Sequence, residues 1–138
     1  MKNVFATIVG FVVASFVVYF FETLIGHTFF PLPEDADPMD IEWIKNNMDK
    51  IPVGSKIFVV IAHFMGIVSG MFVAAKISKI SMIPSYIVGV LMLLATAFVI
   101  LSLPKELWFS LTDGLFAIVG FILGKVIASK YISPIHAQ

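Results

Sequence analysis

The sequence predicts an all-α membrane protein, a four-transmembrane-helix up-and-down bundle with a short extramembrane amphipathic helix between helices 1 and 2. Composition is the first indication: of 138 residues, 59% are hydrophobic and only 13% are charged, whereas an average soluble domain carries about 25% charged residues. The second is a set of long apolar runs at 4–21, 57–75, 80–104 and 107–124, the last interrupted only by Asp113. Each is long enough for the ~17–25 residues of a bilayer crossing. We therefore expect a single integral membrane domain over 1–138.

The first helix is expected over about 4–28. Its apolar run is longer than the core of a typical signal peptide, and no A-x-A-like cleavage site follows before Glu22, so we interpret it as a retained span. The other helices are expected at about 53–75, 84–102 and 105–128, and their short links make neighbours antiparallel. Proline is tolerated in a first helical turn and otherwise ends a helix. Prolines mark these boundaries: Pro31, Pro33, Pro52, Pro84 and Pro104.

The long link at 29–52 has a helical pattern of its own. Asp37 followed by Pro38 is typical of a helix start, with an Asp cap, a proline at the first position and acidic residues in the first turn. Apolar residues then recur at helical spacing: Ile41, Ile44, Met48 and Ile51. We expect a short amphipathic helix that either lies on the outer membrane surface or covers the mouth of the bundle.

The distribution of lysines predicts the orientation. Four spans place both termini on one side of the membrane. Five lysines flank that side and four the other: Lys2, Lys76, Lys79, Lys125 and Lys130 against Lys45, Lys50, Lys56 and Lys105. By the positive-inside rule the first group is cytoplasmic. We expect a multi-pass protein of a bacterial inner (cytoplasmic) membrane with both termini in the cytoplasm and the 29–52 link outside.

Three ionisable residues lie inside predicted spans. Glu22, His63 and Asp113 are 9, 11 and 9 residues from the prolines that bound their helices, which is roughly 13–16 Å of depth at ~1.5 Å per residue. A charge within the membrane costs at least ~2.5–3.5 kcal/mol, so such groups normally face the bundle interior and find partners. We therefore predict one intramembrane polar cluster, open to the outer side, with Tyr19 nearby.

Helical geometry predicts which faces meet. His63 shares a face with Gly66 and Gly70, and Asp113 shares one with Gly120 and Gly124. Both glycine pairs are small-x3-small motifs, which allow close approach of helices within one chain or between copies. The bundle should be tight in its cytoplasmic half and looser in its outer half. Stripes are also expected on the first and third helices: Ser15, Tyr19, Glu22 and Gly26, and Ser85, Gly89, Met92 and Thr96.

Each feature has a structural alternative. The cluster is either a satisfied polar lock between helices or a site for a proton or ligand, and Glu22 is near enough to the outer boundary to reach the headgroups instead. There is no cysteine, so thiolate metal sites and disulfides are excluded. No catalytic motif, cofactor motif or metal-ligand spacing is present, and the loop acids lack EF-hand spacing. With zero net charge and no basic patch, nucleic acid is not expected as a partner. We predict a non-enzymatic protein without cofactor or metal.

One pattern resembles that of a family. Glu22, then Gly26-His27, then Phe30-Pro31-Leu32-Pro33 is similar to a Glu-x3-Gly-His…aromatic-Pro-x-Pro pattern of small, uncharacterised bacterial four-span membrane proteins. Those proteins continue with an acidic loop, a glycine-rich second span and a Pro-x-x-Trp-Phe-like entry to the fourth, which is one residue longer here. The resemblance implies four spans and an outward acidic loop, and it adds His27 to Glu22 as a family-type position of the cluster.

Two functions are consistent with this sequence. The first is a non-enzymatic accessory or self-associating subunit of a membrane assembly, with the lipid bilayer and a protein partner or second copy around it. It is favoured by the lack of catalytic motifs and by the glycine-lined faces. The second is a small proton- or cation-coupled transporter that uses Glu22, in the manner of the small multidrug antiporters, which are also short four-span proteins with one embedded Glu.

Overall fold

Four long apolar helices form the protein in the computed structural model, which describes residues 1–37, 40–103 and 106–133. Within these residues, four helical spans are long and apolar enough to cross a membrane. The first consists of α1 (Lys2–Tyr19), the π-helix η1 (Phe20–Gly26) and α2 (His27–Phe29). The others are α4 (Val53–Ser78), α5 (Ile83–Ser102) and α6 (Leu107–Ser129). The predicted fold class is confirmed. The predicted helix start at Pro104-Lys105 lies outside the described residues.

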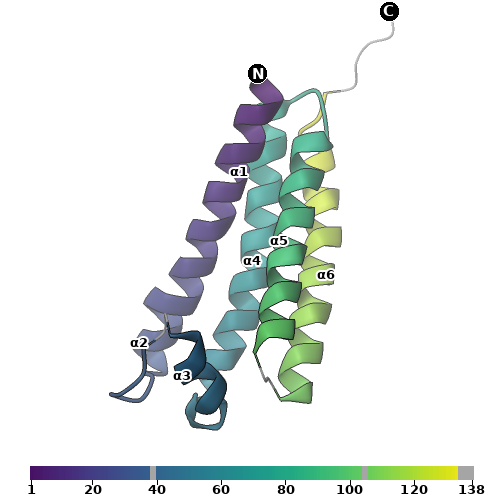
Figure 1. The fold of residues 1–138 in the computed structure, drawn as a ribbon. Helices are drawn as coiled ribbons and strands as arrows, with labels where there is room; N and C mark the ends of the chain where they lie inside the picture. Colours follow the sequence, from purple (N-terminus) through teal and green to yellow (C-terminus); the bar gives the residue numbers. More distant parts are fainter. Residues whose placement is uncertain (38–39, 104–105, 134–138) are drawn as a thin grey trace, which may run out of the picture.

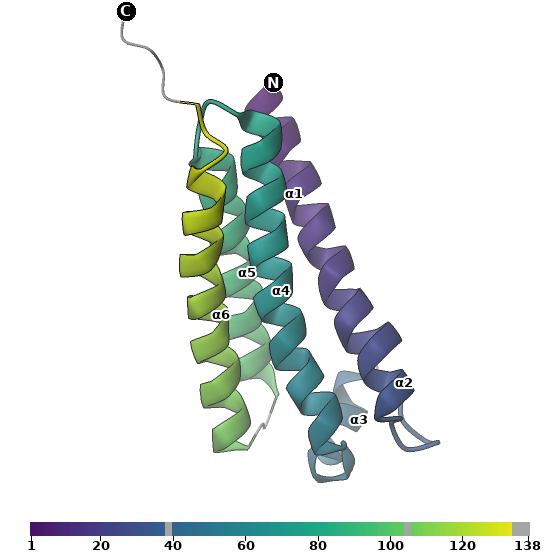
Figure 2. The ribbon, with the colours of Figure 1, turned by 180° about the vertical axis from the view of Figure 1, so that it is seen from behind.

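The helices run alternately up and down, and the start of α1 and the end of α6 lie at the same end of the bundle (Figure 1). They do not form a symmetric square. α4 packs against all three other spans, and 44% of its most apolar window is buried, against 17% for the first span. α1 lies close to α4 at the end that holds the N-terminus and diverges from it toward the end that holds α2 and α3 (Figure 2). Helix α4 is therefore the centre of the fold.

Small residues hold α1 against α4 at the N-terminal end. Ala6, Gly10 and Ala14 are the buried residues of α1. A methyl group built on Gly70 would lie 2.6 Å from the Ala14 Cβ and 2.8 Å from the Gly10 carbonyl oxygen. Such distances leave no room for a side chain. The small-x3-small row on α1 is a packing surface that the sequence interpretation missed, because it weighed only glycine pairs.

The predicted packing glycines of α6 meet α4 in the same way. A methyl group on Gly120 would lie 3.1 Å from the Phe64 carbonyl oxygen, and one on Gly124 would lie 2.8 Å from the Met71 sulfur. A methyl group on Gly66 would lie 2.6 Å from the Val18 Cγ2 on α1. All four predicted glycines therefore make contacts within the chain. These faces are not free to pair with a second copy.

Hydrogen bonds close the same end of the bundle. The Ser78 hydroxyl donates to the Asn3 side-chain oxygen at 2.9 Å, which joins α4 to α1, and the Ser133 amide donates to the Lys79 carbonyl at 2.8 Å. Ser85 donates to the Met71 carbonyl at 2.8 Å between α5 and α4. Lys79, with φ of 65°, ends α4 in the left-handed conformation typical of a helix C-terminus. This half of the bundle is fastened by packing and by side-chain bonds.

The short helix starts later than the sequence pattern indicated. α3 spans Ile41–Asn46, and its cap is Asp40, whose Oδ1 accepts from the amides of Glu42 and Trp43 at 2.9 and 3.1 Å. The prediction that Asp37 caps it was wrong, because its carbonyl instead accepts from the Asp40 amide in a preceding turn. Pro38 lies outside the described residues.

α3 and the 3₁₀ turn η2 (Met48–Lys50) cover the mouth of the bundle at the end opposite to the N-terminus (Figure 1). Met48 is buried in a small core with Val60 and Phe109, and Ile44, Ile51 and Leu103 pack around it. Of the two arrangements left open by the sequence, the structure has the covering one.

Candidate functional site

A buried histidine and a buried aspartate meet between α4 and α6. The His63 Nδ1 is 2.7 Å from the Asp113 Oδ1, and their side chains are 9% and 0% exposed. Close packing of Gly120 on the Phe64 backbone brings the two helices near enough for this contact. Because each partner satisfies the other, neither leaves an uncompensated polar group in an apolar interior. This contact joins α4 and α6 in the half of the bundle away from the N-terminus.

Glu22 lies in the π-helix η1, where the backbone of the first span departs from α-helical geometry over Phe20–Gly26. Short π-helical stretches are rare and are often found at functional sites. The Glu22 side chain is half-buried. Within the described part of the chain, no hydrogen bond or ion pair joins its carboxylate to another residue. An unpaired carboxylate on a membrane span is costly in its charged form.

A cavity of about 280 Å³, here called the α1–α5 groove, lies where α1 diverges from its neighbours. Its polar lining comes from four positions on three helices: Ser15, Glu22, His63 and Thr96. The remaining lining is apolar: Phe11, Val18, Met92, Ala95 and Val99. Glu22 and His63 therefore both line the groove. Asp113 is hydrogen-bonded to His63 but is not itself part of the lining.

Thr96 is a buried polar residue of this groove whose hydroxyl makes no hydrogen bond with the described residues. Its side chain belongs to a residue that is 2% exposed, yet its Oγ1 has no hydrogen-bond partner within the described residues. Several other hydroxyls on the spans donate to the carbonyl four residues earlier, as Ser15 does to the Phe11 carbonyl at 3.0 Å. A buried hydroxyl without a partner costs about 1–3 kcal/mol. Thr96 thus lines the groove and carries a hydroxyl that has no hydrogen-bond partner among the described residues.

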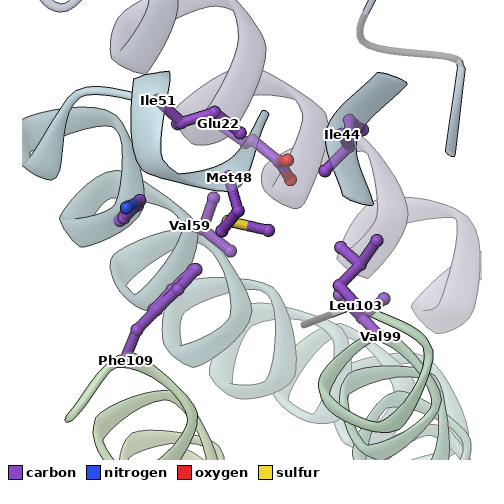
Figure 3. Close-up of a pocket in the computed structure, with 9 residues that line it drawn as sticks. Glu22, Ile44, Met48, Ile51, Val59, Val99, Leu103 and Phe109 are labelled. Carbon is purple, nitrogen blue, oxygen red and sulfur yellow. The ribbon is translucent and has the colours of Figure 1, made fainter. Parts of the chain in front are cut away.

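A second, smaller cavity of about 90 Å³, here called the outer cavity, lies on the other side of Glu22. Figure 3 shows the Glu22 carboxylate extending toward Ile44 and Met48, with Val99 and Leu103 on the opposite wall. Lys56 also lines this cavity, and its Nζ is 2.6 Å from the Glu106 Oε1, with the lysine side chain only 3% exposed. The lysine charge is compensated by Glu106 and not by Glu22.

The sequence-predicted site residues separate into two groups. Glu22 and His63 share the groove, and Asp113 bonds to His63. Tyr19 is 52% exposed and His27 is half-buried, and neither lines the groove or the outer cavity. The wider turn of the π-helix changes the angle between Tyr19 and Glu22, which an unbroken α-helix would place on one face.

Sequence reasoning did not assign Thr96, Lys56 or Glu106 to the site. Thr96 was placed in the helix-three stripe, where its polarity was unremarked, and Lys56 was counted as a flanking charge. The position of Lys56 as the fourth residue of a span could have indicated its pairing, because a lysine there either reaches water or needs a partner for its charge. Within the described residues, no group of three His, Asp or Glu side chains is arranged to hold a metal ion.

Comparisons with protein-family models, curated proteins and solved structures find no match to this chain. By the length and composition of its helices, it is a small multi-span membrane protein. The resemblance to bacterial four-span proteins remains a prediction.

Proposed function

We propose that this protein is a small proton- or cation-coupled transporter in which Glu22 is the carboxylate that binds the coupling ion. The observation that carries the proposal is the position of Glu22: it is unpaired within the described chain and borders both the α1–α5 groove and the outer cavity. His63, which is paired with Asp113, lines the groove, and Lys56, which is paired with Glu106, lines the outer cavity.

The coupling follows from the cost of charge in this environment. A protonated Glu22 is neutral and stable among apolar side chains, whereas an ionised Glu22 requires a cation beside it. A proton and another cation therefore compete for one carboxylate, which is the requirement for exchange across a membrane. Lys56 does not compete for Glu22 because Glu106 already compensates its charge.

The packing restricts access to Glu22 from both ends of the bundle. Glycine contacts close the bundle at the end that holds the N-terminus, and α3 with η2 covers the opposite end. Access from the end that holds the N-terminus requires α1 to move against α4, and the π-helix η1 is a point at which the first span can bend. In the orientation predicted by the lysines, in a bacterial inner membrane with cytoplasmic termini, Glu22 lies in the outer half.

Proteoliposomes loaded with a pH-sensitive dye test the proposal. Gradients of H⁺, Na⁺ or K⁺ are imposed in turn, and we expect the wild type to change the internal pH faster than protein-free vesicles under at least one of them. Glu22→Gln should return the rate to that of protein-free vesicles. Glu42→Gln is the matched control, because the Glu42 side chain is 77% exposed on α3. Equal rates for wild type and Glu22→Gln would exclude Glu22 as the carrier.

An accessory or self-associating subunit is the second candidate. Its support is that the α1–α5 groove has mostly apolar walls between two spans, where a helix of a partner could lie. The glycine faces no longer favour it, because they make contacts within the chain. Crosslinking in native membranes distinguishes the two: a stoichiometric partner or a homodimer supports the subunit, and a monomer alone contradicts it.

A further inference from the structure

We propose that the α1–α5 groove binds the ammonium head of a hydrophobic amine, an organic cation that carries N–H groups on an alkyl chain. This inference rests on the proposed role of Glu22 and names the substrate class of that site. It starts from the kind of hydrogen-bonding group that faces the groove.

The groove offers acceptors. The Glu22 carboxylate can only accept hydrogen bonds. The Ser15 hydroxyl already donates a hydrogen bond to the Phe11 carbonyl, so the Ser15 oxygen can only accept a further one. The Thr96 hydroxyl is unused and can accept. With Asp113 ionised, the His63 Nδ1–H donates to it, and a neutral His63 then presents Nε2 as an acceptor as well.

The charges of the groove also require a cation. Among the described residues, no cation pairs with the Glu22 carboxylate. An ionised Glu22 therefore brings a negative charge to the groove that no neighbouring side chain offsets. A cation with several N–H donors satisfies both the charge and the acceptors, and a primary ammonium has three such donors. A quaternary ammonium satisfies the charge alone and leaves Thr96 without a partner.

The rest of the groove fits an alkyl chain. Phe11, Val18, Met92 and Ala95 provide apolar walls, and the volume of about 280 Å³ is close to the lower limit of ligand pockets, roughly 300 Å³. Phe11 and Ser15 are exposed on α1, so the groove opens sideways, toward the lipid. An amphipathic amine dissolved in the bilayer could reach it without crossing the cover formed by α3.

Calorimetric titration of the full chain in phosphatidylcholine nanodiscs tests the proposal, with empty nanodiscs subtracted. The probes are hexylamine, hexyltrimethylammonium and 1-hexanol, which share one chain and differ in N–H groups and charge. We expect saturable one-site binding of hexylamine and no saturable binding of 1-hexanol. A loss of affinity of about tenfold or more is expected for hexyltrimethylammonium, because the charge-assisted hydrogen bonds are absent.

Variants locate the site. Glu22→Gln should weaken hexylamine binding about tenfold or more, and Thr96→Val, which keeps the shape and removes the hydroxyl, about threefold to tenfold. Thr96→Ser keeps the acceptor and should bind as the wild type does. Thr112→Val makes the same change on α6 outside the groove and should have no effect. None of these changes removes a packed partner, and circular dichroism checks that each variant folds.

Three outcomes would overturn the inference: no saturable binding of hexylamine, equal binding of hexyltrimethylammonium, or full affinity in Thr96→Val. The last would mean that water satisfies Thr96. The result is separable from that of the transport assay. Glu22-dependent ion flux without amine binding leaves the transporter and removes the substrate class, whereas amine binding without flux leaves a binding protein and removes transport.

Discussion

The contact between His63 and Asp113 predicts a non-additive response to mutation. We consider His63→Phe, Asp113→Leu and the double variant. The carboxylate is 0% exposed and the imidazole 9%, with 2.7 Å between the hydrogen-bonded atoms, so the Asp113 carboxylate is shielded from bulk water. Breaking a buried pair from one side costs about 3–5 kcal/mol, whereas replacing both partners by apolar side chains of similar volume is often nearly neutral. Each single variant should therefore lose about 3 kcal/mol of unfolding free energy, and the double variant less than either.

Reversible unfolding in mixed micelles, followed by circular dichroism, measures the four members of this cycle. The expected coupling energy is at least about 3 kcal/mol, above the ~0.6–2 kcal/mol of a neutral interhelical hydrogen bond. The exposed pair of Lys45 and Glu42, 3.6 Å apart, is the matched control and should show no measurable coupling. Additive losses at His63 and Asp113 would refute the reasoning, because they would mean that each side chain finds other partners when the first is removed.

Three further predictions follow from packing, capping and orientation. Gly70→Ala should destabilise the protein by about 1–3 kcal/mol, because its methyl group would lie 2.6 Å from the Ala14 Cβ. Gly114→Ala should not destabilise it, because that methyl group would be 3.7 Å from its nearest neighbour. Melting curves compare the two variants, and equal losses of stability would contradict the packing argument. Asp40→Ala should lower the helicity of the 40–50 segment and reduce the stability of α3 by about 1 kcal/mol. Amide hydrogen exchange measures this loss, and unchanged protection of the α3 amides would exclude Asp40 as the cap. Because the chain has no cysteine, Lys130→Cys and Lys45→Cys can be labelled singly in intact cells: an impermeant maleimide should label only the second, and labelling of the first would reverse the orientation.

The four spans could be predicted because the information for them is local. A run of about 20 apolar residues is expected to be helical in a bilayer, because only a helix satisfies the backbone hydrogen bonds within a single segment. Matched depth also indicated which ionisable residues lie at one level, and His63 and Asp113 are in fact hydrogen-bonded. The same local reasoning misplaced the cap of α3 by three residues, since Asp37 and Asp40 carry the same signal and only the path of the chain selects between them.

The class of protein, the number of spans and the residues whose burial must be compensated all follow from the order of the amino acids. The central position of α4, the divergence of α1 from it and the groove that Glu22 in the π-helix shares with His63 could be found only in the folded protein. Those features depend on distances between residues far apart in the chain, such as the backbone approach of Gly10 to Gly70. Periodicity assigns a residue to a face, but the packing of whole helices decides whether that face meets a neighbour, a cavity or lipid. Thr96 shows the difference: its position in a stripe was predictable, and its missing hydrogen bond was not, because that depends on every atom around it.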